Sequence, residues 1–370
     1  DVRYSGGGIA VPFTISDYRV PNDVFDITDF GAKCDGSTND YTAINAARTA
    51  ATAQTNGGTV LIPSNVTGSC LINSSITFDA DVTLAFEGGG RLTIASGTTT
   101  TINGAIVAPL AQVFAGSGNP AFGSRVEAVY PQWMGMTCDG TTNDSAAINR
   151  SIAARGQGLV RITRSANPCI VQLYDQIGTI DYDVLLTSFI ELEIQEGAEL
   201  RHSGSTASMV LSMGSQLVTD TALTANVAIG ATSVAVTSAA GLATGQDIVL
   251  SATPCSTAAS PLCSQEVNRI AGVSGLTITL ETPTVFAYTT ANSATLGAWT
   301  FIEHSFVTGG GTINGNSLSS TLVHMADAKH CRVSNLKLIG STGTGRGVLL
   351  ANRTNRCIVE NNDVRNVADR

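Results

Sequence analysis

The chain of 370 residues is poor in aromatic and charged side chains, which make up 5% and 13% of it. Its 20 Lys and Arg are outnumbered by 29 Asp and Glu, so the formal net charge is −9. This balance argues against a nucleic-acid-binding protein, which would need a basic face. It does not exclude an anionic polysaccharide as ligand, because a local groove can be basic on an acidic protein.

Long apolar runs are also lacking. The chain has no stretch of about 18 apolar residues, so we expect no membrane-spanning helix and no membrane insertion. The first residues, Asp1-Val2-Arg3-Tyr4, have neither an initiator Met nor the apolar core of a signal peptide. The sequence therefore reads as one that starts inside a longer protein.

None of the eight cysteines is in the CxxC spacing of a zinc site. A chain of this length does not need disulfides for stability, so we expect most cysteines to be buried thiols. Cys255 and Cys263 flank a short Pro/Ser/Ala loop and are the best candidates for a bridge. Cys331 and Cys357 are also spaced compatibly with a disulfide, although stacked inward thiols are the simpler expectation.

What the chain does have is one motif twice. Cys-Asp-Gly-Ser-Thr-Asn-Asp at residues 34–40 returns as Cys-Asp-Gly-Thr-Thr-Asn-Asp at residues 138–144, 104 residues later. An Ala-rich stretch with helical spacing and a Gly-flanked β-like run follow each copy. We expect Asp35 and Asp139 to form turns with the next Gly, and Asp40 and Asp144 to bind free N–H groups at the helix starts. Two copies of one module predict a repeat architecture.

The last 70 residues show a shorter period. Phe306, Arg332 and Ile358 are 26 residues apart, and apolar residues alternate around each of them. A period in the twenties with short β-segments is typical of a parallel β-helix, in which each coil contributes about three strands. The final β-segments end at Arg370 without a cap, so we expect further coils or a cap beyond this residue.

These patterns divide the chain into five segments. Residues 1–24 form a neck or linker, 25–129 the first start module and coils, and 130–215 the second start module and coils. Residues 216–300 break the rhythm with hairpin-like strands, which predicts a small inserted β-domain. Residues 301–370 are β-helix coils that continue beyond the fragment.

The start motifs resemble a known family. Phe-Gly-Ala-Lys-Cys-Asp-Gly at residues 30–36 resembles the start of pectate-lyase-like right-handed β-helices. Tyr-Pro-Gln-Trp-Met-Gly at residues 130–135 is similar to a variant in bacteriophage tailspikes and bacterial polysaccharide-degrading proteins, with Met134 and Met136 in place of the usual Phe and Ala. The resemblance covers most of residues 25–370. It implies an all-β right-handed parallel β-helix (solenoid) with two helix-containing start modules and a small inserted β-domain.

On a β-helix, a glycan would lie along outward columns of side chains repeated from coil to coil. Neighbouring strands lie about 4.8 Å apart, so the side chains of a column touch. The 26-residue register stacks His304 on His330 and Arg356, and Lys337 on Asp363. The residues expected to bind substrate are His304, Phe306, His330, Arg332, Lys337 and Arg356.

Cleavage would need further groups. A hydrolase requires two carboxylates about 5–10 Å apart, which Glu303 with Glu360, or Glu360 with Asp363, could supply. A lyase would instead use a base such as Arg or His. An ordinary solvated β-face with ion pairs is the alternative to both. No cofactor is expected, although Asp181 with Asp183, or Glu191 with Glu193, could hold Ca²⁺ if a third oxygen ligand converged.

The resemblance implies a phage tailspike that binds a bacterial surface polysaccharide and depolymerises it. It implies a homotrimer in the virion tail, joined to other phage tail proteins through an N-terminal head that this chain lacks. Two alternatives stay open: a non-catalytic structural or adsorption virion protein of the same fold, and a secreted bacterial polysaccharide lyase or hydrolase. A head domain upstream would favour the phage protein, and a signal peptide the secreted enzyme.

Overall fold

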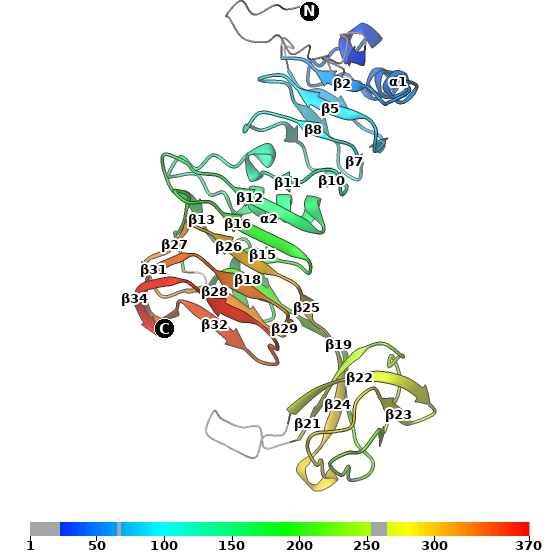
Figure 1. The fold of residues 1–370 in the computed structure, drawn as a ribbon, viewed down its shortest axis with the longest axis vertical. Helices are drawn as coiled ribbons and strands as arrows, with labels where there is room; N and C mark the ends of the chain where they lie inside the picture. The colour runs from blue at the N-terminus through cyan, green and yellow to red at the C-terminus, as the bar shows by residue number, and fades with distance from the viewer. Residues whose placement is uncertain (1–22, 65–67, 206, 253–264, 370) are drawn as a thin grey trace, which may run out of the picture. The chain divides into compact units, whose positions relative to one another are not determined.

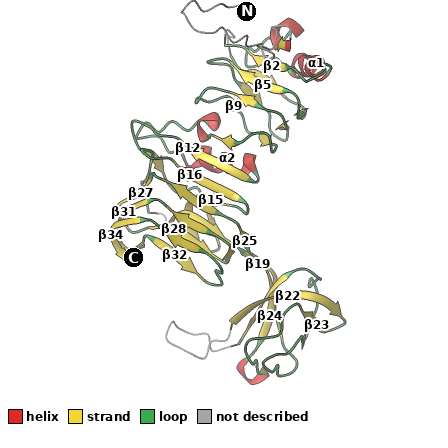
Figure 2. Ribbon diagram, in the orientation of Figure 1, coloured by secondary structure: helices red, strands yellow, loops and turns green. Residues whose placement is uncertain are grey.

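The computed structural model describes residues 23–64, 68–205, 207–252 and 265–369 (Figures 1 and 2). The chain forms two compact units, of residues 1–109 with 115–126 and of residues 110–114 with 127–370. Both are mostly β, and each is described by itself below. Among the described residues, no helix has the length and apolar character needed to cross a membrane.

The first unit is a parallel β-solenoid of three short sheets. Val60 and Ile62 of β2 face the core and are fully buried, while the residues between them are partly exposed, as expected for strands covered on one face. Each turn of the chain, here called a coil, adds one strand to each sheet, so that β2 pairs in parallel with β5 and β4 with β7. The sheets are β1 (Val24–Asp26), β2 (Thr59–Ile62), β5 (Thr83–Phe86) and β8 (Ile106–Val107); β3 (Cys70–Ile72), β6 (Leu92–Ile94) and β9 (Phe114–Ala115); and β4 (Ile76–Phe78), β7 (Thr99–Ile102) and β10 (Asn119–Phe122).

Each start motif leads into one of the two α-helices, α1 (Tyr41–Thr52) and α2 (Ser145–Arg155). The helical spacing predicted for the first is confirmed, because Ala43, Ile44, Ala47 and Ala51 are its buried residues. A short 3₁₀ helix, η2 (Ile27–Phe30) or η3 (Pro131–Met134), precedes each motif. The repeated sequence therefore folds twice into the same local structure.

The predicted role of Asp40 and Asp144 as side-chain caps is wrong. Neither carboxylate accepts a hydrogen bond from its helix. Asp40 instead accepts bonds from the backbone N–H groups of Lys33, Cys34 and Leu71, at 2.6–3.3 Å. Because these donors come from two separate segments, the buried carboxylate links the residues before α1 to strand β3 of the first coil.

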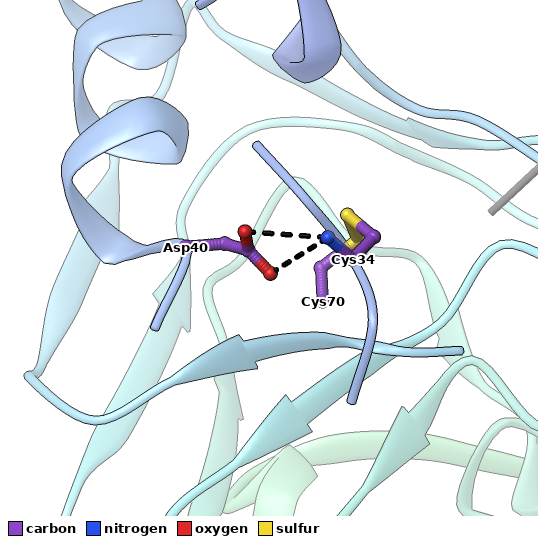
Figure 3. Close-up of side chains that lie close together, drawn as sticks. All are labelled: Cys34, Asp40 and Cys70. Atoms are coloured by element: carbon purple, nitrogen blue, oxygen red, sulfur yellow. Dashed lines mark hydrogen bonds between the residues drawn. A yellow bond between two sulfur atoms is a disulfide. The ribbon is translucent and has the colours of Figure 1, made fainter. Parts of the chain in front are cut away.

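The expectation of buried thiols is also wrong for the cysteines that the structure describes. Cys34 is bonded to Cys70, Cys138 to Cys169, and Cys331 to Cys357. Figure 3 shows Asp40 beside the Cys34–Cys70 disulfide, with its carboxylate bound to the backbone of Cys34. Partners 26–36 residues apart in sequence become neighbours through coil stacking, a relation that the sequence indicated for Cys331 and Cys357 only. The predicted Cys255–Cys263 bridge lies outside the described residues.

The second unit is a larger solenoid of three sheets, here named D, E and F. Sheet D is β11 (Ala128–Val129), β12 (Gly158–Ile162), β16 (Ile190–Ile194), β26 (Phe306–Gly309), β30 (Arg332–Ser334) and β33 (Ile358–Glu360). Sheet E is β13 (Cys169–Val171), β17 (Glu199–His202), β27 (Thr312–Leu318), β31 (Lys337–Arg346) and β34 (Asp363–Asp369). Sheet F is β14 (Asp175–Ile177), β15 (Ile180–Leu186), β18 (Ser208–Met213), β28 (Thr321–Ala326) and β32 (Val348–Ala351).

The strands of these sheets pair in parallel, apart from the antiparallel edge strand β14. The predicted 26-residue register is confirmed, because Phe306, Arg332 and Ile358 are successive Cα partners in sheet D. A parallel pair of strands also joins β25 (Ile302–Glu303) to β29 (Ala328–Lys329) at the turn before sheet D.

An antiparallel sheet interrupts the second solenoid after β18. Its strand order is β19 (Ser215–Ala222), β24 (Thr295–Thr300), β21 (Asp247–Ser251), β22 (Gln265–Ser274), β23 (Thr277–Leu280) and β20 (Ser233–Ala235). It has an apolar core of its own, which includes Val236, Ile248, Leu250 and the buried Tyr288. The solenoid resumes at β26, which pairs directly with β16 of the preceding coil.

Two contacts tie this inserted sheet to the coils. The Arg353 guanidinium lies 3.6 Å from the centroid of the Trp299 ring, and its Nε donates to Asp327 Oδ1 at 2.6 Å. Lys329 Nζ lies 2.7 Å from Asp247 Oδ2. Asp327 is fully buried, so its pairing with Arg353 offsets the cost of removing that charge from water.

Candidate functional site

Four side chains stack at the turn that leads into sheet D. They are Phe189, His304, His330 and Arg356, one from each of four coils, and we call them the turn ladder. The rings of Phe189 and His304 are nearly parallel with centroids 5.2 Å apart, and those of His304 and His330 are 5.0 Å apart. Arg356 Nη1 lies 3.5 Å from His330 Nε2. The predicted column of His304, His330 and Arg356 thus exists and has Phe189 as a further member.

The backbone of the turn ladder is in an unusual conformation. All four residues have positive φ, between 53° and 63°. This left-handed region costs most L-residues roughly 1–2 kcal/mol, and Gly or Asn occupies it most easily. At several other turns of the same solenoid the residue with positive φ is Asn, as at Asn335, Asn352 and Asn361. His is also enriched in this region, whereas Phe and Arg are not, so the turn conformation alone does not explain Phe189 and Arg356.

Backbone hydrogen bonds fix the spacing of the ladder. The N–H of Phe189 donates to the carbonyl of Glu303 at 2.8 Å, that of His304 to Lys329 at 3.1 Å, and that of His330 to Asn355 at 3.0 Å. The stacked rings are thus attached to a rigid parallel framework rather than to a loop. A binding surface built this way loses little conformational entropy when a ligand binds.

The ladder borders the outer face of sheet D. Along this face Glu191, Phe306, Arg332 and Ile358 are Cα partners from coil to coil. The Phe306 ring meets His304 edge-on, with centroids 6.5 Å apart. Arg332 pairs with Glu360, at 3.6 Å between Nε and Oε1, and both side chains are nearly half exposed. The structure therefore brings five of the predicted binding residues and one predicted acid to a single surface.

The other predicted acids lie elsewhere. Glu303 precedes His304, and its Cα partner in the next coil is Lys329, which is in turn the partner of Asn355. Glu303 therefore lies two coils from Glu360, a separation of about 10 Å along the solenoid axis. Glu360 ends β33 on sheet D, whereas Asp363 begins β34 on sheet E, and the turn of Asn361 separates them. Of the three predicted acids, only Glu360 thus lies on the outer face of sheet D.

Lys337 and Asp363 belong to the outer face of sheet E. They are Cα partners on β31 and β34, as predicted. Together with Ile339, Arg365 and Asn366 they line a hollow of about 420 Å³. The predicted set of site residues is therefore divided between two neighbouring faces of the solenoid.

Three of the four acids proposed for Ca²⁺ have other partners, and Asp181 is the fourth. Asp183 is fully buried and its Oδ2 lies 2.8 Å from His202 Nδ1. Glu193 pairs with Arg161 at 2.6 Å, and Glu191 accepts a hydrogen bond from Thr308 at 2.7 Å. The groups of Cys34, Asp40 and Cys70 and of Cys138, Asp144 and Cys169 also bring potential metal ligands together. Their sulfur atoms form disulfides, so no thiolate is available to a metal.

The sequence did not reveal Phe189 as part of the site. Its equivalent in the next coil, His304, is 115 residues away because the inserted sheet lies between them. A search for the 26-residue period cannot cross that gap. The strand patterns at residues 190–194 and 306–309, which pair in the structure, could have revealed it once the insertion was removed from the count.

No family model and no curated protein matches the chain. Its fold does match solved structures. The Gp54 tailspike of Acinetobacter baumannii bacteriophage AP22, in complex with capsular saccharide, is 13% identical with a TM-score of 0.37; the match covers 60% of this chain and 44% of that one. The tailspike gp49 of Pseudomonas phage LKA1 is 16% identical with a TM-score of 0.37, over 62% and 46%. The A-module of Azotobacter vinelandii mannuronan C-5 epimerase AlgE4 is 13% identical with a TM-score of 0.32, over 94% and 97%.

The chain matches phage tailspikes and other right-handed β-helix proteins. At these identities the similarity concerns the fold. The fold is shared by tailspikes, adhesins and polysaccharide-modifying enzymes. The match spans less than half the length of the Gp54 and gp49 tailspikes.

Proposed function

We propose that the protein binds a bacterial surface polysaccharide along the turn ladder and the adjoining outer face of sheet D. The single observation that supports this is the continuous stack of Phe189, His304, His330 and Arg356 along four coils. Sugar rings present C–H faces that pack on aromatic rings, and their hydroxyl groups bond to imidazole and guanidinium N–H donors. A column with a regular rise suits a ligand that is itself a repeating chain.

Within this proposal the protein is the right-handed β-helix body of a phage tailspike or a close relative, assembled as a homotrimer and attached to the tail through an upstream head. The disulfides favour an oxidising environment outside the cytosol. The same environment would suit a secreted bacterial enzyme. Analytical ultracentrifugation of the protein would test the trimer, and a monomer would remove this part of the proposal.

Cleavage of the bound glycan is the finer part of the proposal. Glu360 is the predicted acid that lies on the same face as the ladder, next to Arg332. A hydrolase would pair it with Asp363 or Glu303, whereas a lyase would use His330, Arg332 or Arg356 to remove a proton. A non-catalytic adsorption protein would use the same surface to hold its ligand only.

One experiment separates these cases. The full-length protein is incubated with a panel of bacterial capsules and O-antigens, and reducing ends and the ultraviolet absorbance of unsaturated sugars are measured. Reducing ends alone identify a hydrolase, and added absorbance identifies a lyase. Cell binding without either product identifies an adsorption protein. The variants Glu360→Gln and Arg356→Ala show whether this face is responsible: if both retained full activity and binding, the proposed site would be wrong.

A further inference from the structure

We infer that the hollow on sheet E is a second binding site, for a saccharide unit that bears a carboxylate. The strands β27, β31 and β34 stack in this sheet (Figure 1), and their outward residues form two parallel columns. One column is Glu199, Thr312, Lys337 and Asp363, and the other is Arg201, Asn314, Ile339 and Arg365.

The two ends of this face differ in how their charges are paired. At one end the Glu199 carboxylate accepts hydrogen bonds from Arg201 Nε and from Asn314 Nδ2, both at 2.8 Å. The charges of Glu199 and Arg201 therefore neutralise each other. At the other end Lys337 is exposed and forms no ion pair within the described part of the chain. The free positive charge therefore lies at the hollow.

Arg365 adds a second cation to the hollow. The Asp363 Oδ1 accepts a hydrogen bond from Arg365 Nε at 2.7 Å, and the Arg365 side chain stays largely exposed. That contact uses only one edge of the guanidinium and leaves the terminal nitrogens for a second anion. With Lys337, Arg365 and Asp363 together, the lining has a net charge of about +1, on a chain whose total is −9. In this arrangement Asp363 is a positioning residue.

The other residues that line the hollow indicate what the ligand carries besides its carboxylate. Ile339 gives the hollow an apolar wall, and Asn366 adds an amide that can donate and accept hydrogen bonds. The volume of about 420 Å³ falls within the range of small-molecule sites. An apolar wall with an amide and two cations fits a sugar ring with hydroxyl groups and one carboxylate. The sugar part of this inference rests on the proposed polysaccharide function, whereas the anion part rests on the hollow alone.

Ligand-observed NMR on the full chain tests the inference with three probes: glucuronate, its methyl ester and inorganic phosphate. We expect glucuronate to bind at least about tenfold more tightly than the ester, which lacks the charge. Lys337→Met should weaken glucuronate binding by at least about tenfold and leave ester binding unchanged. The matched control is Arg201→Met, which removes a cation from the same face outside the hollow and should leave glucuronate binding unchanged.

Three results would overturn the inference: equal binding of glucuronate and ester, an unchanged affinity in Lys337→Met, or phosphate binding as tight as glucuronate, which would mean a bare anion site. A turn-ladder variant, His330→Asn, keeps this test separate from the proposed function. If it abolishes polysaccharide binding and retains glucuronate binding, both sites stand. If it leaves polysaccharide binding intact while Lys337→Met abolishes glucuronate binding, the ladder proposal fails and the sheet E site remains.

Discussion

At the scale of single residues, the turn ladder differs in composition from other turns of the solenoid. His304 and His330 occupy a left-handed turn conformation that Asn335 and Asn361 occupy at other turns. Strain of this kind is tolerated where the surrounding structure fixes it, and it gathers at functional sites. The ladder is thus distinguishable from a solvated β-face by conformation as well as by chemistry.

Replacing His330 by Asn should therefore separate binding from folding. Asn adopts the left-handed region more easily, and this gain of about 1 kcal/mol offsets the lost ring stacking. We expect the Tm to change little and the affinity for the cognate polysaccharide to fall by about tenfold or more. The reverse control, Asn335→His, should lower the Tm and leave binding unchanged. A parallel loss of Tm and affinity in His330→Asn would mean that the ladder is structural.

Two further residues, Asp35 and Asp139, should make the stability of the fold depend on pH. The backbone N–H groups of Thr38 and Ser37 donate to the Asp35 carboxylate, and those of Thr142 and Thr141 donate to the Asp139 carboxylate. These hydrogen bonds hold the pKa of each carboxyl below its usual 3.8. A lowered pKa in the folded state stabilises the fold above pH 3.8, and this contribution is lost as the pH falls through the folded pKa. The double variant Asp35→Ala and Asp139→Ala should show a smaller loss of Tm between pH 5 and 2 than the wild type, measured by thermal unfolding. An identical slope would contradict the assignment.

At the scale of elements, each start module combines a helix, a buried aspartate and a disulfide. The Cys34–Cys70 bond closes a loop with a sequence separation of 36 that contains α1, and the Cys138–Cys169 bond closes one of 31 that contains α2. Constraint of the unfolded chain by loops of this length is worth about 3–4 kcal/mol each.

Removing one start disulfide should weaken one unit only. For the double variant Cys34→Ala and Cys70→Ala, we expect the unfolding of the first unit to move to lower denaturant by the equivalent of about 3–4 kcal/mol. The transition of the second unit, which keeps Cys138–Cys169, should not move. Urea titration with probes in each unit would show this, and a single shifted transition would contradict independent units.

The elements also show where sequence reasoning succeeds and fails. The 26-residue register and the buried face of α1 were predictable, because each depends on a local periodicity that burial imposes. The disulfides and the true partners of Asp40 were not, because they depend on which coils touch. Phe189 was missed for a related reason, since an 84-residue insertion separates coils that are neighbours in space. The division of the predicted site between sheets D and E depended on turns whose direction the sequence does not specify.

At the scale of the whole second unit, the inserted sheet is an addition to a continuous solenoid. Ser215 and Thr300 are antiparallel Cα partners at its base, and β26 resumes pairing with β16. The solenoid therefore does not need the insertion to close its coils. The inserted sheet has an apolar core of its own and is therefore packed separately from the coils.

Replacing residues 216–299 by an Asn-Gly turn should leave the coils folded, since a two-residue turn can join antiparallel strands. We expect a β-rich circular dichroism spectrum and a Tm lowered by a few degrees, because Arg353 and Lys329 lose Trp299 and Asp247. Binding to the turn ladder should be retained. A variant that fails to fold would show that the insertion is part of the solenoid core.

The start disulfides also determine how the chain transmits a pulling force. Tension that enters before Cys34 passes through the sulfur bridge to Cys70, and the residues between them, including α1, bear no load. The chain between the bridged cysteines, about 120 Å when extended, is thereby withheld from stretching. The second bridge protects α2 in the same way. Under the proposed function, a tailspike under tension would therefore keep both start modules folded. Reduction of the two disulfides would remove this resistance.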